Sequence, residues 1–324
     1  MQWKIRVGGY QLAMMESVEV KRSVELLADI ATIVLPGTAY NKALDVESLI
    51  KHGDKVTIDL GYDGELINEF TGYLESFSTD GGSLKFNCED AIFLYRVSLK
   101  DIELKNVDVS DILKYVNSKV SAYYPNDPPL TLSCDYEFKY DKFVIKGATG
   151  FDVLKKIQEE SKANIYLKDR VLHLHPQYSE IFGKVAYDFS QNIETSDLKY
   201  KLATDRKFLI VVEYTDITGK TKTKEFGTTG GDRSTINMKS IGVSDGATVE
   251  RTAKQALTKK VYTGYEGNIT GWLIPYCDAG YRATITDKEY PYKTGSYYVT
   301  GMEVKFSQSG GARIITLGKR LNDE

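Results

Sequence analysis

Two histidines, His173 and His175, stand one residue apart in the segment VLHLHP. Alternating residues of a strand point to the same face, so the segment predicts two imidazoles side by side. Such a pair can bind a divalent metal ion when further ligands are near. The chain has one other histidine, His52, and the neighbouring carboxylates show no ligand spacing. We therefore expect surface or interface histidines and no metal site.

Other patterns that could carry chemistry are incomplete. Residues 219–221 read GKT, like the end of a phosphate-binding loop, but Tyr214 stands where that loop needs its first glycine. The acidic pairs 89–90 and 159–160 are sequence neighbours. Catalytic carboxylates usually come from separate elements that converge on a cleft. We predict that the chain has no catalytic residues, binds no cofactor and is not an enzyme. The sequence leaves open whether carboxylates from separate elements converge on one cleft.

Composition narrows the class of protein further. The chain has 324 residues and a net charge of −3, which argues against a large basic surface for sequence-specific binding of nucleic acid. Its three cysteines are far apart, so neither a disulfide scaffold nor a structural zinc site is expected. Residues 26–35 are the longest apolar stretch, include Asp29 and are too short to span a membrane. The amino terminus lacks the apolar core of a signal peptide.

The elements that would position any site are mostly strands. Val56, Ile58 and Leu60 alternate before Asp63-Gly64, a strong hairpin signal. The middle of the chain changes character. Thr149 precedes Asp152 by three residues, which resembles a capping box at the start of a helix. From about residue 183 the strands resume, with one predicted helix capped by Ser244 or Asp245.

These patterns predict a β-rich α+β protein with two similar antiparallel β-barrel domains and a small α/β insert between them. We expect the first barrel at 1–98, the insert at 99–180, and the second barrel, with one helix, at 181–324.

An internal repeat supports this division. Residues 71–82 read TGYLESFSTDGG, and residues 300–311 read TGMEVKFSQSGG. In both copies a hairpin precedes the motif and a strand follows it, which indicates duplication of one β-module. The glycines and phenylalanines shared by the two copies are Gly72, Phe77, Gly81, Gly82, Gly301, Phe306, Gly310 and Gly311.

Several of these segments together resemble one protein family. They are GDKVTIDLGYDGE, the repeat itself, TGFDVLKKI followed by LHLHP, YDFSQNIETSDLKY, and the terminal GSYYVTGMEVKFSQSGG. The chain is similar to the baseplate hub proteins of contractile phage tails. These include the late control protein D group of Mu-like and P2-like phages, the hub of T4-like phages and the amino-terminal part of VgrG proteins.

The resemblance implies a structural protein of the virion tail baseplate, made in the cytoplasm of the bacterial host. It implies a homotrimer in which two barrels per subunit give a pseudo-hexameric ring. That ring would join a hexameric tail tube to a trimeric spike and contact other baseplate proteins. The chain ends soon after its last predicted strand, so we expect the spike to be a separate protein and expect no membrane insertion by the chain itself.

Two other functions stay open at this point. A tail-associated cell-wall or polysaccharide hydrolase would need two converging carboxylates. A module that binds host glycans could use the 23 tyrosines, whose rings suit contact surfaces.

Overall fold

The computed structural model describes residues 1–36, 49–80 and 82–322. Within this part of the chain the residues form two compact units, each built from separate segments. Unit 1 contains 1–93, 181–199 and 266–324, and unit 2 contains 94–180 and 200–265. Residues 200–265, which we expected within the second barrel domain, thus belong to the same unit as the insert. The three-domain division stays a prediction.

The first part of unit 1 is a run of antiparallel strands. They are β1 (Gln2–Val7), β2 (Tyr10–Gln11), β3 (Ser17–Ser23), β4 (Ile30–Leu35), β5 (Lys55–Tyr62), β6 (Glu65–Asp80) and β7 (Ser83–Glu89). Val56, Ile58 and Leu60 all point into the core, as their alternation predicts. Asp63 and Gly64 both have positive φ angles and close a two-residue turn between β5 and β6.

The second part of unit 1 consists of residues 181–199 and 266–324. One of the two segments of unit 2 comes directly before each of them in the chain. The strands of this second part are β13 (Gly183–Asp188), β14 (Thr195–Ser196), β19 (Gly264–Trp272), β20 (Tyr281–Thr286), β21 (Gly295–Ser307) and β22 (Gly310–Arg320), and both β19 and the short strand β15 (Lys199–Lys201) cross the boundary to unit 2. The longest of these strands, β21, pairs with β20 through its first residues and with β22 along most of its length.

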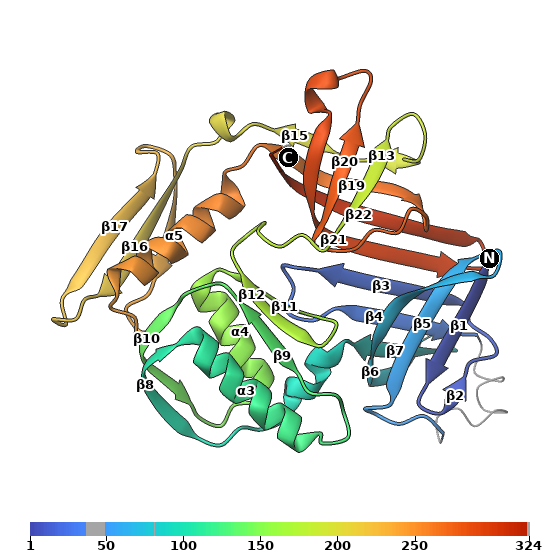
Figure 1. The fold of residues 1–324 in the computed structure, drawn as a ribbon, viewed down its shortest axis with the longest axis horizontal. Helices are drawn as coiled ribbons and strands as arrows, with labels where there is room; N and C mark the ends of the chain where they lie inside the picture. Colours follow the sequence, from blue (N-terminus) through green and yellow to red (C-terminus); the bar gives the residue numbers. More distant parts are fainter. Residues whose placement is uncertain (37–48, 81, 323–324) are drawn as a thin grey trace. The chain divides into compact units, whose positions relative to one another are not determined.

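The two parts of unit 1 form one continuous sheet. The hydrogen-bonded order is β14-β19-β22-β21-β3-β4-β7-β6-β5-β1-β2, with β20 beside β21, β13 beside β20 and β15 beside β19. Figure 1 shows β3, near the blue end of the colour scale, running beside β21, near the red end. Among the described residues none of the sheets closes into a barrel, so the β-rich α+β class is confirmed and the two expected barrels are not.

Unit 2 begins with two helices and two small sheets, one of two strands and one of three. Its first segment contains β8 (Ile102–Asp108), α3 (Val109–Tyr123), β9 (Thr131–Cys134), β10 (Lys139–Ile145), α4 (Gly150–Ser161), β11 (Asn164–Lys168) and β12 (Val171–His175). The predicted capping box at α4 is present. The Thr149 hydroxyl accepts from the Asp152 N–H, and the Asp152 carboxylate accepts from the Thr149 N–H.

The second segment of unit 2 is a small sheet with a helix. It contains β16 (Phe208–Thr215), β17 (Thr221–Gly227), β18 (Asp232–Asn237) and α5 (Gly246–Lys260). Asp245 caps α5 by accepting the Thr248 N–H, as one of the two expected caps. Within the described residues, no helix is both long and apolar enough to cross a membrane.

Candidate assembly interface

Unit 1 contains the same arrangement of six strands twice. In the first copy the sheet order is β3-β4-β7-β6-β5-β1, and in the second it is β14-β19-β22-β21-β20-β13. The strands also follow one another along the chain in the same sequence in both copies. One pairing differs, because β1 is antiparallel to β5 whereas β13 is parallel to β20. A shared order of this length supports duplication of a β-module.

Two of the repeated glycines lie where a neighbouring backbone comes close. A Cβ on Gly72 would stand 2.1 Å from the carbonyl oxygen of Glu89, on the adjacent strand. A Cβ on Gly301 would stand 3.1 Å from the carbonyl oxygen of Arg22. Both positions therefore favour glycine for close packing between strands.

The other repeated residues have different surroundings in the two copies. Phe77 is 43% exposed, whereas Phe306 is 3% exposed and part of the core. Gly82 has a positive φ in the turn between β6 and β7, whereas its counterpart Gly311 lies within strand β22, which begins at Gly310. Gly81 lies outside the described residues. The residue-by-residue equivalence stays a prediction, and the strand order is the stronger evidence for duplication.

The two copies are joined edge to edge by β3 and β21. Their antiparallel register runs from Ser23 opposite Gly301 to Ser17 opposite Ser307. Side chains from both copies share one core cluster, in which Val18 and Val20 of β3 belong with Val304 of β21. This internal junction shows how one module presents an edge strand to the other.

A buried ion pair crosses the junction. Arg313 of β22 and Glu69 of β6 are 0% and 1% exposed. The guanidinium binds the carboxylate through two nitrogens, with Nη2 2.6 Å from Oε1 and Nη1 3.2 Å from Oε2. It also donates to the carbonyl oxygens of Leu273 and Cys277 at 3.1 and 3.0 Å. The pair is bidentate and each charge has its partner, so the geometry fixes the relative position of the two copies.

A second arginine adds to this polar cluster. Arg22 of β3 donates to the carboxylate of Asp278 at 2.9 Å and to the backbone carbonyl of Glu69. Burial alone would lower the pKa of Arg22, but the negative charges around it, with Asp278 the largest contributor, together outweigh this and the pKa is raised. Burial raises the pKa of the nearby Tyr276 hydroxyl, which accepts a hydrogen bond from Arg22.

The two acidic pairs belong to different units of the chain. Asp90 is buried in unit 1, and burial, together with the negative charge of Asp29, raises its pKa well above the usual range. Glu160 lies in unit 2 and accepts a hydrogen bond from the Tyr140 hydroxyl at 2.7 Å. Its pKa is raised by burial.

The GKT segment lies at the hairpin between β16 and β17. Gly219 has a positive φ, and Asp216 closes the turn by accepting from the backbone N–H groups of Thr218 and Lys220. A turn of this kind joins two strands, whereas a phosphate-binding loop leads from a strand into a helix.

Both histidines are buried within unit 2, whereas we expected surface or interface histidines. His173 and His175 are 7% and 3% exposed, and their rings approach through Nδ1 of His173 and Nε2 of His175 at 3.1 Å. Burial, with a smaller effect of His175, lowers the pKa of His173 to about 4. Two carboxylates, Asp135 and Glu180, lie within 3.6 Å of His175 Nδ1. Local spacing could not reveal Asp135, because the parallel pairing of β9 with β12 brings it there.

Comparison with known proteins gives a consistent picture at the level of fold. No protein-family model matches the chain, and no curated protein matches it in sequence. The structure is similar to a tail protein from Neisseria meningitidis MC58, with a TM-score of 0.67 and 19% identity over 98% of this chain and 97% of that one. A 43 kDa tail protein of prophage MuSo2 from Shewanella oneidensis gives a TM-score of 0.66 and 13% identity over 98% of both chains.

A third similar structure comes from a secretion system. It is an E. coli component of the type VI secretion system that is itself described as similar to T4 bacteriophage tail proteins. The TM-score is 0.63 and the identity is 10%, over 99% of this chain and 77% of that one. The chain therefore has the fold of phage tail proteins and of type VI secretion proteins, which agrees with the tail family that its motifs resemble.

Proposed function

We propose that the chain is the structural hub of a contractile phage tail baseplate or a related injection machine, of the late control protein D type. Three copies would form a ring with two similar β-modules each, giving six near-equivalent positions. The ring would join a hexameric tail tube to a trimeric spike carried by a separate protein, and it would contact other baseplate proteins. In this proposal it performs no catalysis.

The observation that carries the proposal is the repeated order of six strands within one sheet. A single chain with two equivalent modules can match a threefold partner on one side and a sixfold partner on the other. The similar tail proteins from Neisseria and Shewanella extend over nearly the whole chain, which supports placing it in a tail. Closure of each module into a barrel belongs to the same proposal, as a consequence of assembly.

The internal junction predicts how copies would meet. We call the first copy of the six strands module one and the second copy module two. Strand β21 of module two pairs along its edge with β3 of module one. Within module two, β14 is the strand that corresponds to β3. In module one, β5 covers β6 as far as Tyr73, and residues 53 and 54 bond to Leu74. Among the described residues no strand pairs with that side of β6 beyond Leu74. A ring forms if β14 of one copy pairs there with β6 of the next.

The experiment is a measurement of mass in solution, followed by imaging of the assembled particle. We expect three copies in a ring with threefold and approximate sixfold symmetry, with β14 beside β6 at each contact between copies. Each heterologous contact should bury an area typical of obligate interfaces, about 2,000–5,000 Å². A closed twofold dimer that buries the β6 edge, or a monomer at every concentration, would contradict self-assembly into this ring.

A covalent trap tests the same contact directly. Thr195 of β14 and Ser78 of β6 are both exposed, so cysteines there should leave the fold intact. Oxidation of the T195C/S78C double variant should link copies into a trimer, because paired strands bring Cβ atoms within disulfide range. Each single variant is the matched control and should stay unlinked. Equal linking by single and double variants would contradict the proposed pairing.

A further inference from the structure

Three side chains that could bind a metal ion converge in unit 2. His175 ends strand β12, Asp135 directly follows β9, and Glu180 lies in the segment after β12. Nδ1 of His175 is 2.5 Å from Oδ1 of Asp135 and 3.6 Å from Oε1 of Glu180. All three ligand atoms lie within 4.8 Å of one another. This spacing allows all three to reach one ion after small side-chain adjustments.

The burial of the cluster is graded from inside to outside. The imidazole of His175 is 3% exposed, whereas the side chains of Asp135 and Glu180 are 50% and 36% exposed. The sheet thus fixes the nitrogen ligand, and the carboxylates stand on the solvent side with freedom to adjust. An ion can enter from that side without opening the core.

The other nitrogen of His175 has a partner that suits a metal ligand. Nε2 lies 3.1 Å from Nδ1 of His173, whose ring stacks on Tyr166 with centroids 5.1 Å apart and planes 7° apart. Histidines that bind metals usually donate their second N–H to a fixed acceptor, which sets the tautomer and the ring orientation. Here an Nε2–H of His175 would donate to His173, and this leaves Nδ1 with its lone pair toward the carboxylates.

We propose that Asp135, His175 and Glu180 form a binding site for Zn²⁺, with His173 as the outer partner of His175. One imidazole nitrogen and two carboxylate oxygens favour this ion over Ca²⁺ and Mg²⁺, which prefer oxygen alone. Water would complete a tetrahedron. On binding, the proton in the hydrogen bond between His175 Nδ1 and Asp135 Oδ1 is released to solvent, both atoms bind the ion, and the distance between them opens to about 3.3 Å.

The site would connect the segment that follows β9 with the segment that follows β12. Asp135 begins the connection from β9 to β10, and Glu180 lies near the point where the chain leaves unit 2. An ion shared by both would hold these segments to β12. This role is separate from the proposed ring, because it stabilises unit 2 in each copy.

The test uses the full chain without a histidine tag, stripped of metal and dialysed against micromolar free Zn²⁺. We expect one ion per chain by elemental analysis, and a rise of about 5–10 °C in the melting temperature of unit 2 at 100 times the dissociation constant. Co²⁺ in place of Zn²⁺ should give the strong visible absorption of a tetrahedral site. Absence of bound Zn²⁺ under these conditions would overturn the proposal.

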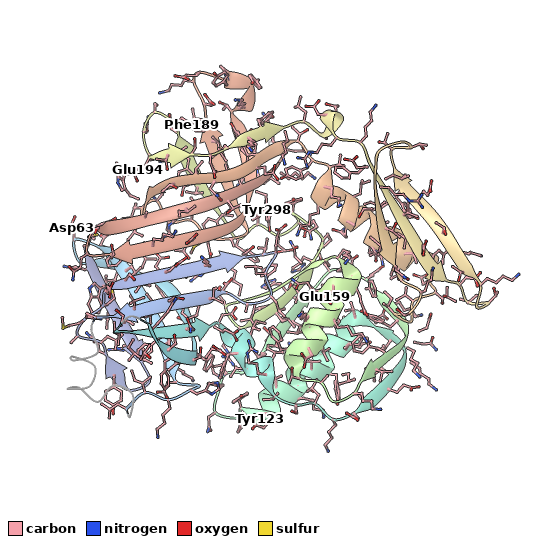
Figure 2. The ribbon with its side chains drawn as sticks, turned by 180° about the vertical axis from the view of Figure 1, so that it is seen from behind. Asp63, Tyr123, Glu159, Phe189, Glu194 and Tyr298 are labelled. Atoms are coloured by element: carbon pink, nitrogen blue, oxygen red, sulfur yellow. The ribbon has the colours of Figure 1, made fainter. Side chains whose placement is uncertain are left out.

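Variants of the exposed ligands identify the site without disturbing the core. The double variant D135N/E180Q should lose at least 90% of the bound Zn²⁺ and the whole shift in melting temperature. The matched control is E159Q, because Glu159 is an exposed carboxylate on α4, outside the cluster (Figure 2). It should bind as the unmodified chain does. Equal binding by D135N/E180Q and by E159Q would place the ion elsewhere and refute the assignment.

Discussion

The ion pair between Arg313 and Glu69 allows a quantitative test of how the two β-modules are held together. In the variant R313M the apolar side chain fills much of the same volume, but the Glu69 carboxylate loses both of its guanidinium bonds. Removing one partner of a buried pair typically costs about 3–5 kcal/mol, because the remaining charge stays buried without compensation. That is a large part of the roughly 5–15 kcal/mol that stabilises a folded domain.

The double variant E69M/R313M isolates the interaction energy between the two side chains from the energy of their other contacts. It leaves no uncompensated charge, and buried pairs replaced by apolar residues are often nearly neutral. Two carbonyl oxygens, of Leu273 and Cys277, do lose a donor. We therefore expect the double variant to be more stable than R313M alone, with a coupling energy of at least about 2 kcal/mol.

Tryptophan fluorescence during unfolding in urea provides the measurement. The two tryptophans, Trp3 and Trp272, both lie in unit 1, so the signal reports the unit that contains the ion pair. This choice matters because a chain of two units need not unfold in one step. A loss below about 1 kcal/mol in R313M, or strictly additive losses in the double variant, would refute the reasoning.

Three further predictions concern single residues. D90N should stabilise unit 1 more at pH 7 than at pH 4. Burial and the negative charge of Asp29 raise the pKa of Asp90 in the folded state, so ionisation of its carboxyl costs stability as the pH rises above the unfolded pKa of about 3.9. Urea titrations at both pH values measure the difference. T149A should destabilise α4 by about 1 kcal/mol, seen as roughly fivefold faster hydrogen exchange of its amides; unchanged exchange would contradict the cap. G72A should lower the free energy of unfolding by about 3 kcal/mol, because its Cβ would stand 2.1 Å from a backbone oxygen. G301A should lower it less, because the corresponding distance is 3.1 Å. Equal losses of stability, followed by tryptophan fluorescence, would contradict this.

Local features of the fold were predictable from the sequence because their causes are local. The alternation that ends at Leu60, the turn at Asp63-Gly64 and the cap at Thr149 each depend on a few neighbouring residues, and all three are present. The repeat indicated two modules, and the order of six strands in the sheet supports this.

Features that depend on distant pairing could not be predicted in this way. Nothing near Ser23 indicates that it lies opposite Gly301, because strand partners far apart in sequence leave no local pattern. The same holds for Asp135, which reaches His175 only through the pairing of β9 with β12. The spacing of carboxylates along the chain therefore could not reveal the cluster around the histidines.

The pairing of β3 with β21 also has a consequence for how the protein is made. The partner strands are about 280 residues apart, and β3 emerges from the ribosome near the start of synthesis. At about 5–20 residues per second, β3 waits roughly 15–60 s before β21 has been translated. During that time its backbone groups can pair with other nascent chains. A cell that produces this protein in quantity must therefore shield the early strands with chaperones or accept loss to aggregates.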